Sequence, residues 1–460
     1  MCSKNVFILF LFIIKLIQIS SLIIPLKSAK NFSNCNSILE LLDFYKNNMK
    51  YSYIGIGELP QRFQIFFISS ESSNVIKGEN CFSDSFYNIT ISNTVQFDYE
   101  QNEKNYFYIK EIISFDNKYH NLLIPFIYYN STIINEENCA SIGFASTLPS
   151  EEDYNFFFEL KKLNAIEKSI FYFNYSNNND ISLIIGLEPF EIDNTYSQNK
   201  KVIGIDPILD YYIKGTKRQY NWNLNFSRIF YLRKIPLKSG IDPYVDINRM
   251  KTRKINFFQA LLVPEEELIK GPFEYQESIE ENFFDKLIAD KICKKYKFEN
   301  KYYFYCKKQY QKLIKNTFPS LYFYQEKLNY MFELTYDDLF IEKGDILFFG
   351  IYFDCFLIEV YRGAFISEWN FGKLFLKKYI FAFDFEKNEL LFYKKNKIKK
   401  KKSEEKKNTD QEKDIKNKIY QLGLILVVIT IGVFAFLLDR YARRKHRLNN
   451  VLIDFDSRQL

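Results

Sequence analysis

The chain has 460 residues, of which 47% are apolar and 18% aromatic, and its formal net charge is +7. This length suits one large domain or two ordinary domains, and the apolar content suits a globular core. The positive excess comes largely from the segment after residue 395. A basic nucleic-acid-binding domain is therefore not expected, and no nucleic-acid partner is predicted.

The amino terminus predicts a secretory signal peptide. Lys4 precedes an apolar run, and this basic-then-apolar order is typical of such peptides. We assign residues 1–29 to the signal peptide, with cleavage near Ser20–Ser21 or around Ala29, and we expect a short segment at 30–50 to follow. An uncleaved signal anchor is the alternative.

A second apolar run near the carboxyl terminus predicts a transmembrane helix. Residues 419–438 carry no charge and are long enough to cross a bilayer. A charged stalk at 396–418 precedes this run, and a tail at 439–460 that begins with a basic cluster follows it. Five glycosylation sequons precede the helix, at Asn31, Asn88, Asn130, Asn174 and Asn225. These features predict a single-pass type I membrane glycoprotein of the secretory pathway or cell surface.

The cysteines predict disulfides. If Cys2 leaves with the signal peptide, six remain: Cys35, Cys81, Cys139, Cys293, Cys306 and Cys355. An even count in an oxidising compartment is consistent with up to three bridges, but spacing alone does not give their pairing.

The region from 51 to 395 predicts a mostly β architecture. Short runs of β-branched and aromatic residues, such as Arg62–Ile68 and Tyr379–Tyr393, alternate with polar turns. The region is longer than a single sheet-built core usually is. We therefore expect an amino-terminal lobe at 51–215 and a carboxyl-terminal lobe at 216–395.

Several common catalytic chemistries lack support in the sequence. His120 and His446 are the two histidines, and only His120 precedes the predicted membrane helix. No Cys-x-x-Cys, His-Glu-x-x-His or glycine-rich phosphate loop occurs. No metal and no cofactor are therefore expected.

One segment resembles an active-site motif. Residues 53–76 read YIGIGELPQRFQIFFISSESSNVI, which is similar to the first active-site region of the pepsin-like aspartic proteases, where Asp-Thr-Gly-Ser-Ser-Asn follows an apolar strand. Here that stretch begins at Ser69 and contains one extra residue. The aspartate position falls on Ser69, or on Ile68 with the other gap placement.

Three further segments resemble the same family, in its order and spacing. The segment 139–144 contains Gly143 and is similar to the apolar-apolar-glycine segment of the amino lobe. The segment 259–272, QALLVPEEELIKGP, matches the second active-site motif without a gap and has Val263 at the aspartate position. Trp369 and Gly372 belong to a segment similar to the end of the carboxyl lobe.

The resemblance implies a bilobal, pepsin-like fold whose catalytic chemistry is lost. In this family two aspartates share one proton and activate a water molecule. Ser69 and Val263 have no carboxylate, so we predict an inactive member. Glu71 and Glu265 lie at the glycine positions of their motifs and are weak candidates for substitute acids, because their side chains start from different backbone sites.

The resemblance also implies two further assignments. Tyr99 lies where the family has its flap tyrosine, although an ordinary strand tyrosine is an equal interpretation. A disulfide between Cys306 and Cys355 would correspond to the family's carboxyl-lobe bridge.

The function expected from these features is binding of an extended peptide or luminal protein without cleavage. The first alternative is a divergent, membrane-bound aspartic endopeptidase that uses Glu71 and Glu265. The second is a structural surface protein whose cleft is filled by its own side chains.

Overall fold

The structure is a computed structural model. It describes residues 21–28, 35, 37–47, 50–56, 61–68, 74–77, 92, 94–98, 106–115, 122–129, 140–145, 155–175, 181–205, 222–232, 244–246, 258–355 and 368–396. Several predicted sites lie outside these residues: Ser69, Glu71, Tyr99, Cys81, Cys139, His120, Asn31, Asn88, Asn130 and the segment 397–460. Among the residues that are described, no helix combines the length and apolar character needed to cross a membrane.

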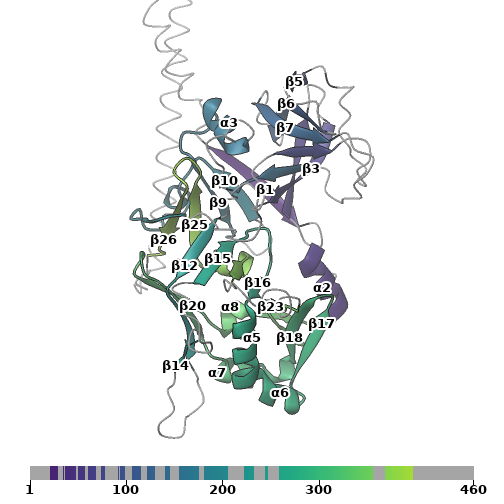
Figure 1. The fold of residues 1–460 in the computed structure, drawn as a ribbon, viewed down its shortest axis with the longest axis vertical. Coiled ribbons are helices and arrows are strands. Elements are labelled where there is room, and N and C mark those ends of the chain that lie inside the picture. The colour runs from purple at the N-terminus through teal and green to yellow at the C-terminus, as the bar shows by residue number, and fades with distance from the viewer. Residues whose placement is uncertain are drawn as a thin grey trace, which may run out of the picture. The chain divides into compact units, whose positions relative to one another are not determined.

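The protein is mostly β, as predicted (Figure 1). In the described ranges, thirteen strands form the largest sheet. They are β1 (Leu22–Ser28), β2 (Lys50–Ile56), β3 (Gln61–Ile68), β4 (Val75–Lys77), β5 (Gln96–Asp98), β6 (Tyr106–Phe115), β7 (Leu122–Tyr129), β8 (Ala140–Gly143), β9 (Ile170–Asn174), β10 (Ile181–Ile185), β11 (Lys201–Gly204), β25 (Ile380–Asp384) and β26 (Glu389–Tyr393). The predicted strands at Arg62–Ile68 and Tyr379–Tyr393 correspond to β3 and to the hairpin of β25 and β26.

Two further sheets are built from the described part of the chain between 223 and 371. The second sheet contains β12 (Asn223–Phe226), β15 (Phe258–Leu262), β16 (Ile269–Gly271), β17 (Cys293–Phe298), β18 (Lys301–Lys307), β21 (Phe340–Lys343), β22 (Ile346–Phe349), β23 (Ile351–Asp354) and β24 (Glu368–Phe371). The third contains β13 (Arg228–Leu232), β14 (Tyr244–Asp246), β19 (Leu321–Gln325) and β20 (Tyr330–Leu334).

The helices are short. They are α2 (Ile38–Asn47), α3 (Phe156–Lys162), α4 (Pro189–Ile192), α5 (Phe273–Ile279), the π-helix η4 (Glu280–Phe284), α6 (Asp285–Ala289), the 3-10 helix η5 (Lys308–Tyr310), α7 (Gln311–Thr317), α8 (Tyr336–Leu339) and α9 (Lys373–Lys378). Helix α2 is amphipathic, with Leu41, Leu42 and Phe44 on its buried side. Because an isolated helix of this length is marginal in water, packing of that side stabilises it.

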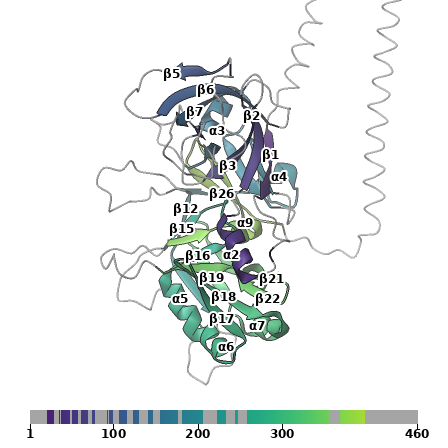
Figure 2. The same cartoon turned by 90° about the vertical axis from the view of Figure 1, so that its right-hand side faces the viewer.

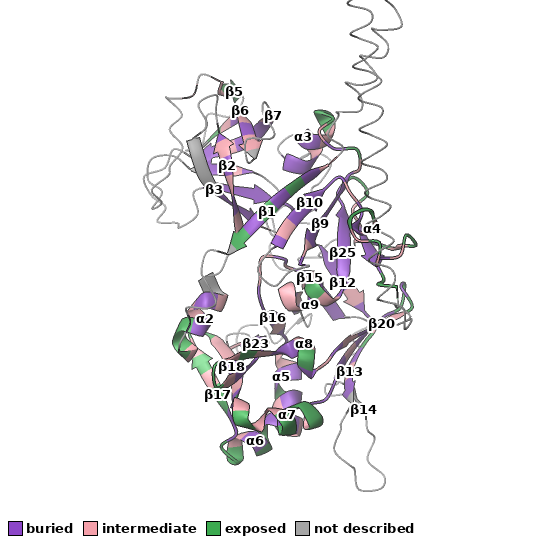
Figure 3. Cartoon of the chain, turned by 180° about the vertical axis from the view of Figure 1, so that it is seen from behind, coloured by how far each residue is buried: buried purple, intermediate pink, exposed green. Residues whose placement is uncertain are grey.

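Aromatic side chains dominate the core. Trp222 and Trp369 are almost completely buried, and they make edge-to-face contacts with the rings of Phe171, Phe383 and Phe323. Each fully buried large apolar side chain contributes roughly 1.5–3 kcal/mol. Figure 3 shows many of the strands in the buried colour, whereas much of β17, α6 and α7 is exposed. The aromatic content of the sequence is therefore used largely for packing.

The structure bears on two predicted boundaries. Strand β1 pairs with β10 over Leu22–Leu26, and its residue Ile24 is completely buried. Segment 22–28, which we expected within the signal peptide, is thus part of a sheet. Cleavage around Ala29 would remove this strand, whereas cleavage near Ser20–Ser21 would leave it in place.

The last hairpin also crosses the predicted lobe boundary. Strand β25 pairs with β9, and β26 pairs with β11. Strands expected in the lobe 216–395 therefore share a sheet with strands of 51–215, because their apolar faces, such as Phe381 and Phe383, are buried in the common core. The predicted junction at 215 and 216 lies outside the described residues.

Candidate functional site

The same strand pairing occurs twice in the chain. In the first unit, β3 runs parallel to β8, β8 is antiparallel to β4, and β4 runs parallel to β7. In the second unit, β15 runs parallel to β24, β24 is antiparallel to β16, and β16 runs parallel to β23. The two units contain the two sequence segments that resemble active-site motifs, so their backbones can be compared residue by residue.

Hydrogen bonds fix the correspondence between the units. The N–H of Phe144 donates to the carbonyl of Ile68 at 3.1 Å, and the N–H of Val263 donates to the carbonyl of Phe371 at 3.0 Å. In a parallel ladder only alternate residues direct both peptide groups to the partner strand. Ile68 and Val263 are such residues, and they lie opposite Gly143 and Gly372 respectively.

The next strands confirm this alignment. Val75 pairs with Ser141, and Lys270 pairs with Asn370. Val75 follows Ile68 by the same number of residues as Lys270 follows Val263, so no gap is needed between the two units. The counterpart of Val263 is therefore Ile68, and our assignment of that role to Ser69 is replaced by the other gap placement.

This correspondence also separates the two candidate substitute acids. Glu71 is the third residue after Ile68, and the third residue after Val263 is Glu266. Glu71 and Glu265 are thus not symmetry-related positions. Ile68 and Val263 are both half-buried aliphatic residues, and neither can share or transfer a proton.

The loop 263–268, which we call the site loop, is held by its neighbours. The N–H of Glu266 donates to the Val263 carbonyl at 3.0 Å, and the N–H of Lys373 donates to the Glu266 carbonyl at 2.7 Å. A Cβ at Gly372 would lie 2.3 Å from the Leu268 carbonyl oxygen and 2.4 Å from that of Glu266. Close passage of the site loop therefore requires glycine at 372.

Three consecutive glutamates occupy the site loop. Glu267 is buried and forms an ion pair with Lys373, with 3.0 Å between Oε2 and Nζ. The Tyr352 hydroxyl donates to Oε2 of Glu266 at 3.3 Å. Burial raises the pKa of Glu266 above its ordinary value, and the charge of Lys301 and the Tyr352 bond oppose this rise. These carboxylates are fixed by their own neighbours.

Tyr175 covers the start of the site loop. Its hydroxyl donates to the Pro264 carbonyl at 3.1 Å. Burial, followed by the charges of Glu267 and Glu265, raises the pKa of Tyr175 well above its ordinary value. Glu265, our second candidate acid, is half-buried beside this neutral phenol.

Helix α2 packs next to the site loop. Its buried residues share a cluster with Leu268 of the site loop and with Tyr303, Phe348 and Tyr352 of the second sheet. Burial and then the charge of Glu267 raise the pKa of Tyr45, which places this helical tyrosine close to the loop. Figure 2 shows the purple helix α2 against the green elements of the second sheet. No local sequence pattern predicts this contact, because it joins segments more than two hundred residues apart.

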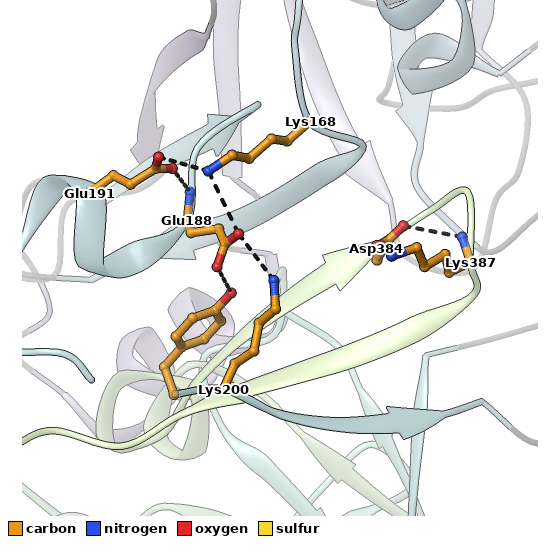
Figure 4. Close-up of polar contacts among 7 residues, drawn as sticks. Lys168, Glu188, Glu191, Lys200, Asp384 and Lys387 are labelled. Atoms are coloured by element: carbon orange, nitrogen blue, oxygen red, sulfur yellow. Dashed lines mark hydrogen bonds and ion pairs between the residues drawn. The ribbon is translucent and has the colours of Figure 1, made fainter. Parts of the chain in front are cut away.

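A second polar cluster surrounds Glu188, just before α4 (Figure 4). Its carboxylate accepts from the Tyr393 hydroxyl at 2.8 Å and from Lys200 at 3.0 Å, and Lys168 lies 3.6 Å away. Burial alone would raise the pKa of Glu188, but the bonds from Tyr393 and Lys200 outweigh it and lower that pKa. The cluster joins α4 to β11 and β26, so its role is structural.

The disulfide prediction is wrong. Cys306 is bonded to Cys293, its direct partner in the β17–β18 hairpin. The N–H of Cys355 donates instead to the Asn300 carbonyl, six residues before Cys306. At about 3.3 Å per residue this separation is about 20 Å, far beyond disulfide reach. Among the described cysteines Cys355 is a free thiol.

The structure describes two of the predicted sequon asparagines. Asn174 lies at the end of β9 and Asn225 lies within β12, and both residues are half-buried. Glycosylation at these two positions stays a prediction.

The comparisons with known proteins add no family. No protein-family model matches this sequence, and no curated protein matches it. Within the part of the chain that the structure describes, no group of three His, Cys, Asp or Glu residues could hold a metal ion. The candidate site therefore consists of two equivalent strand ends, Ile68 and Val263, with an acidic, well-fixed loop after the second.

Proposed function

We propose that this chain is a pepsin-like protein without peptidase chemistry, which binds an extended peptide or luminal protein. The observation that carries this proposal is the pair of equivalent positions Ile68 and Val263. A repeated strand arrangement and a retained glycine at 372 favour the pepsin-like, two-lobed fold. The absence of a carboxylate at both positions favours binding without hydrolysis.

The binding test uses the full-length protein in detergent and a library of fluorescent ten-residue peptides. We expect saturable binding that Val263→Arg weakens at least about tenfold, because the arginine places a charge at a half-buried site. Val202→Arg is the matched control, since Val202 is 47% exposed on β11 and lies outside the site loop. Equal loss in both variants, or no peptide bound at all, would count against the proposal.

The endopeptidase alternative has one supporting observation, which is the cluster of three glutamates in the site loop. Incubation of the full-length protein with unfolded substrate between about pH 3 and pH 7, with and without pepstatin, tests it. We expect no cleavage that pepstatin inhibits. Inhibitable cleavage that Glu265→Gln or Glu266→Gln abolishes would replace binding with catalysis as the function.

We also propose that the protein is a single-pass type I membrane glycoprotein of the secretory pathway or cell surface. The uncharged segment 419–438 and the sequons before it support this topology. Protease treatment of sealed microsomes should remove only the tail 439–460. Protection of the tail, or digestion of the whole amino-terminal region, would contradict the topology.

A further inference from the structure

One described segment carries a charge that the net value conceals. Residues 286–315 contain ten lysines and two acidic residues, whereas the whole 460-residue chain has a net charge of only +7. The rest of the region before the stalk is therefore acidic. Segregation of charge within a folded region creates a local potential that steers oppositely charged partners.

The lysines lie on and around β17, which has one open edge. Strand β17 pairs with β18, and within the described ranges no other strand pairs with it. Lys307 donates its N–H to the Ile292 carbonyl. Because hydrogen-bonded pairs alternate in an antiparallel ladder, the N–H and C=O groups of Lys295 and Lys297 face outward from the hairpin.

The open edge is rigid and its lysines are largely available. The disulfide between Cys293 and Cys306 closes the base of the hairpin. Lys294 and Lys297 are exposed. In the described part of the chain, three of the ten lysines form carboxylate ion pairs, namely Lys295, Lys308 and Lys315. Figure 3 shows exposed green surface on α6 and α7, the helices that flank this hairpin in sequence.

We propose that the outer edge of β17 binds an extended acidic polypeptide by strand addition. Its main-chain groups would pair with β17, while carboxylates on both faces of the added strand would pair with Lys294 on one face and Lys297 on the other. The open main chain favours a polypeptide over a polysaccharide or lipid surface, since neither of these completes a strand edge. This binding site is separate from the site loop and does not depend on the proposed function.

Edge lysines also have a simpler use, which is to prevent association of edge strands. That use predicts solubility without affinity for any ligand. It therefore differs from strand addition in a measurable way.

The experiment measures fluorescence anisotropy of a labelled peptide of ten glutamates, which has carboxylates on both faces when extended, with the full-length protein in detergent. The double variant Lys294→Glu with Lys297→Glu should lower affinity at least about tenfold, because two attractions become repulsions. The control double variant Lys286→Glu with Lys312→Glu has the same charge change on α6 and α7, and it should lower affinity less than about threefold. A peptide of the same sequence that is N-methylated at every residue should bind as weakly as the unmodified peptide binds the first double variant, because neither of its edges can donate to the ladder.

Four outcomes would overturn the proposal. The first is equal weakening in both double variants, which indicates diffuse attraction. The second is unchanged binding of the N-methylated peptide. The third is binding of heparin or phosphatidylserine vesicles but not of the glutamate peptide, and the fourth is no binding of any probe. Thermal melting of each variant confirms that a loss of binding does not reflect unfolding.

Discussion

The unit of β3, β4, β7 and β8 and the unit of β15, β16, β23 and β24 share a backbone but differ in their loops. After Ile68 the first unit continues with serines and one glutamate, whereas after Val263 the second continues with Pro264 and three glutamates. The second loop is fixed by Lys373, Tyr175 and Tyr352. Both units thus have the same strand arrangement although neither has an acid at the equivalent position, so packing and hydrogen bonds hold these two strand ends.

The largest expected effect concerns the β17–β18 hairpin, which extends the second unit and not the first. Replacing Cys293 and Cys306 with serine should lower the free energy of unfolding by about 3 kcal/mol, since the bridge closes a short loop in the unfolded chain. Cys355→Ser is the control and should change stability by less than about 0.5 kcal/mol. Peptide mapping without reduction should recover the 293–306 bridge. Recovery of a 306–355 bridge would restore our original pairing.

A second, smaller effect tests the close passage of the site loop over Gly372. Gly372→Ala should lower the free energy of unfolding by about 1–3 kcal/mol, because the Cβ would meet two carbonyl oxygens that cannot move independently. Gly204→Ala is the matched control, because nothing lies within 4 Å of its Cβ position. Denaturant unfolding measures both. If the two variants unfold alike, the site loop does not pass over Gly372 as described.

A third effect compares the two buried tryptophans. The indole N–H of Trp222 donates to the Phe144 carbonyl beside the first unit, whereas that of Trp369 in β24 has no acceptor among the described residues. Trp222→Phe removes a hydrogen bond and leaves a buried carbonyl unsatisfied, so it should cost about 1–2 kcal/mol more than Trp369→Phe. Thermal unfolding of the two variants measures the difference. A larger loss for Trp369→Phe would show that its N–H has a partner.

The sequence predicted the strands and the retained glycine but not the exact correspondence of the units. Apolar alternation around Arg62–Ile68 was sufficient to place β3, and the gap-free match was sufficient to identify Val263. The choice between Ile68 and Ser69 as the counterpart of Val263 required knowing which residue hydrogen-bonds to the partner strand. That depends on the strand register and not on the local sequence. The disulfide was mispredicted for the same reason, since the β17–β18 register decides which cysteine lies opposite Cys306.

Long-range contacts set the remaining limit on prediction. Strand β1 lies in the region that we assigned to the signal peptide, and helix α2 lies in the short segment predicted to follow it. Both nevertheless contain completely buried residues, Ile24 and Leu42. Their amphipathic or apolar character was visible, but a short apolar run does not reveal what covers it. The excess of lysines around β17 was likewise not apparent from the net charge, which averages over the whole chain.

The smallest expected effect compares the pH response of Glu266 in the site loop with that of Glu188 in the structural cluster. Burial raises the pKa of Glu266 above 4.5, so the folded state favours its protonated form. This contribution to stability is present below the unfolded pKa and is lost as the pH rises through the folded pKa. Glu266→Gln should therefore stabilise the protein near pH 7, and its advantage should vanish near about pH 4.

Glu188 should respond with the opposite sign. Its pKa is lowered from 4.5 because the bonds from Tyr393 and Lys200 outweigh the effect of burial. Its contribution is present above the unfolded pKa and is lost as the pH falls through the folded pKa. Glu188→Gln should thus destabilise the protein near pH 7 and lose that effect in acid. Denaturant unfolding at several pH values measures both variants, and a common sign would show that the site loop holds Glu266 as an ionised structural partner, as the cluster holds Glu188.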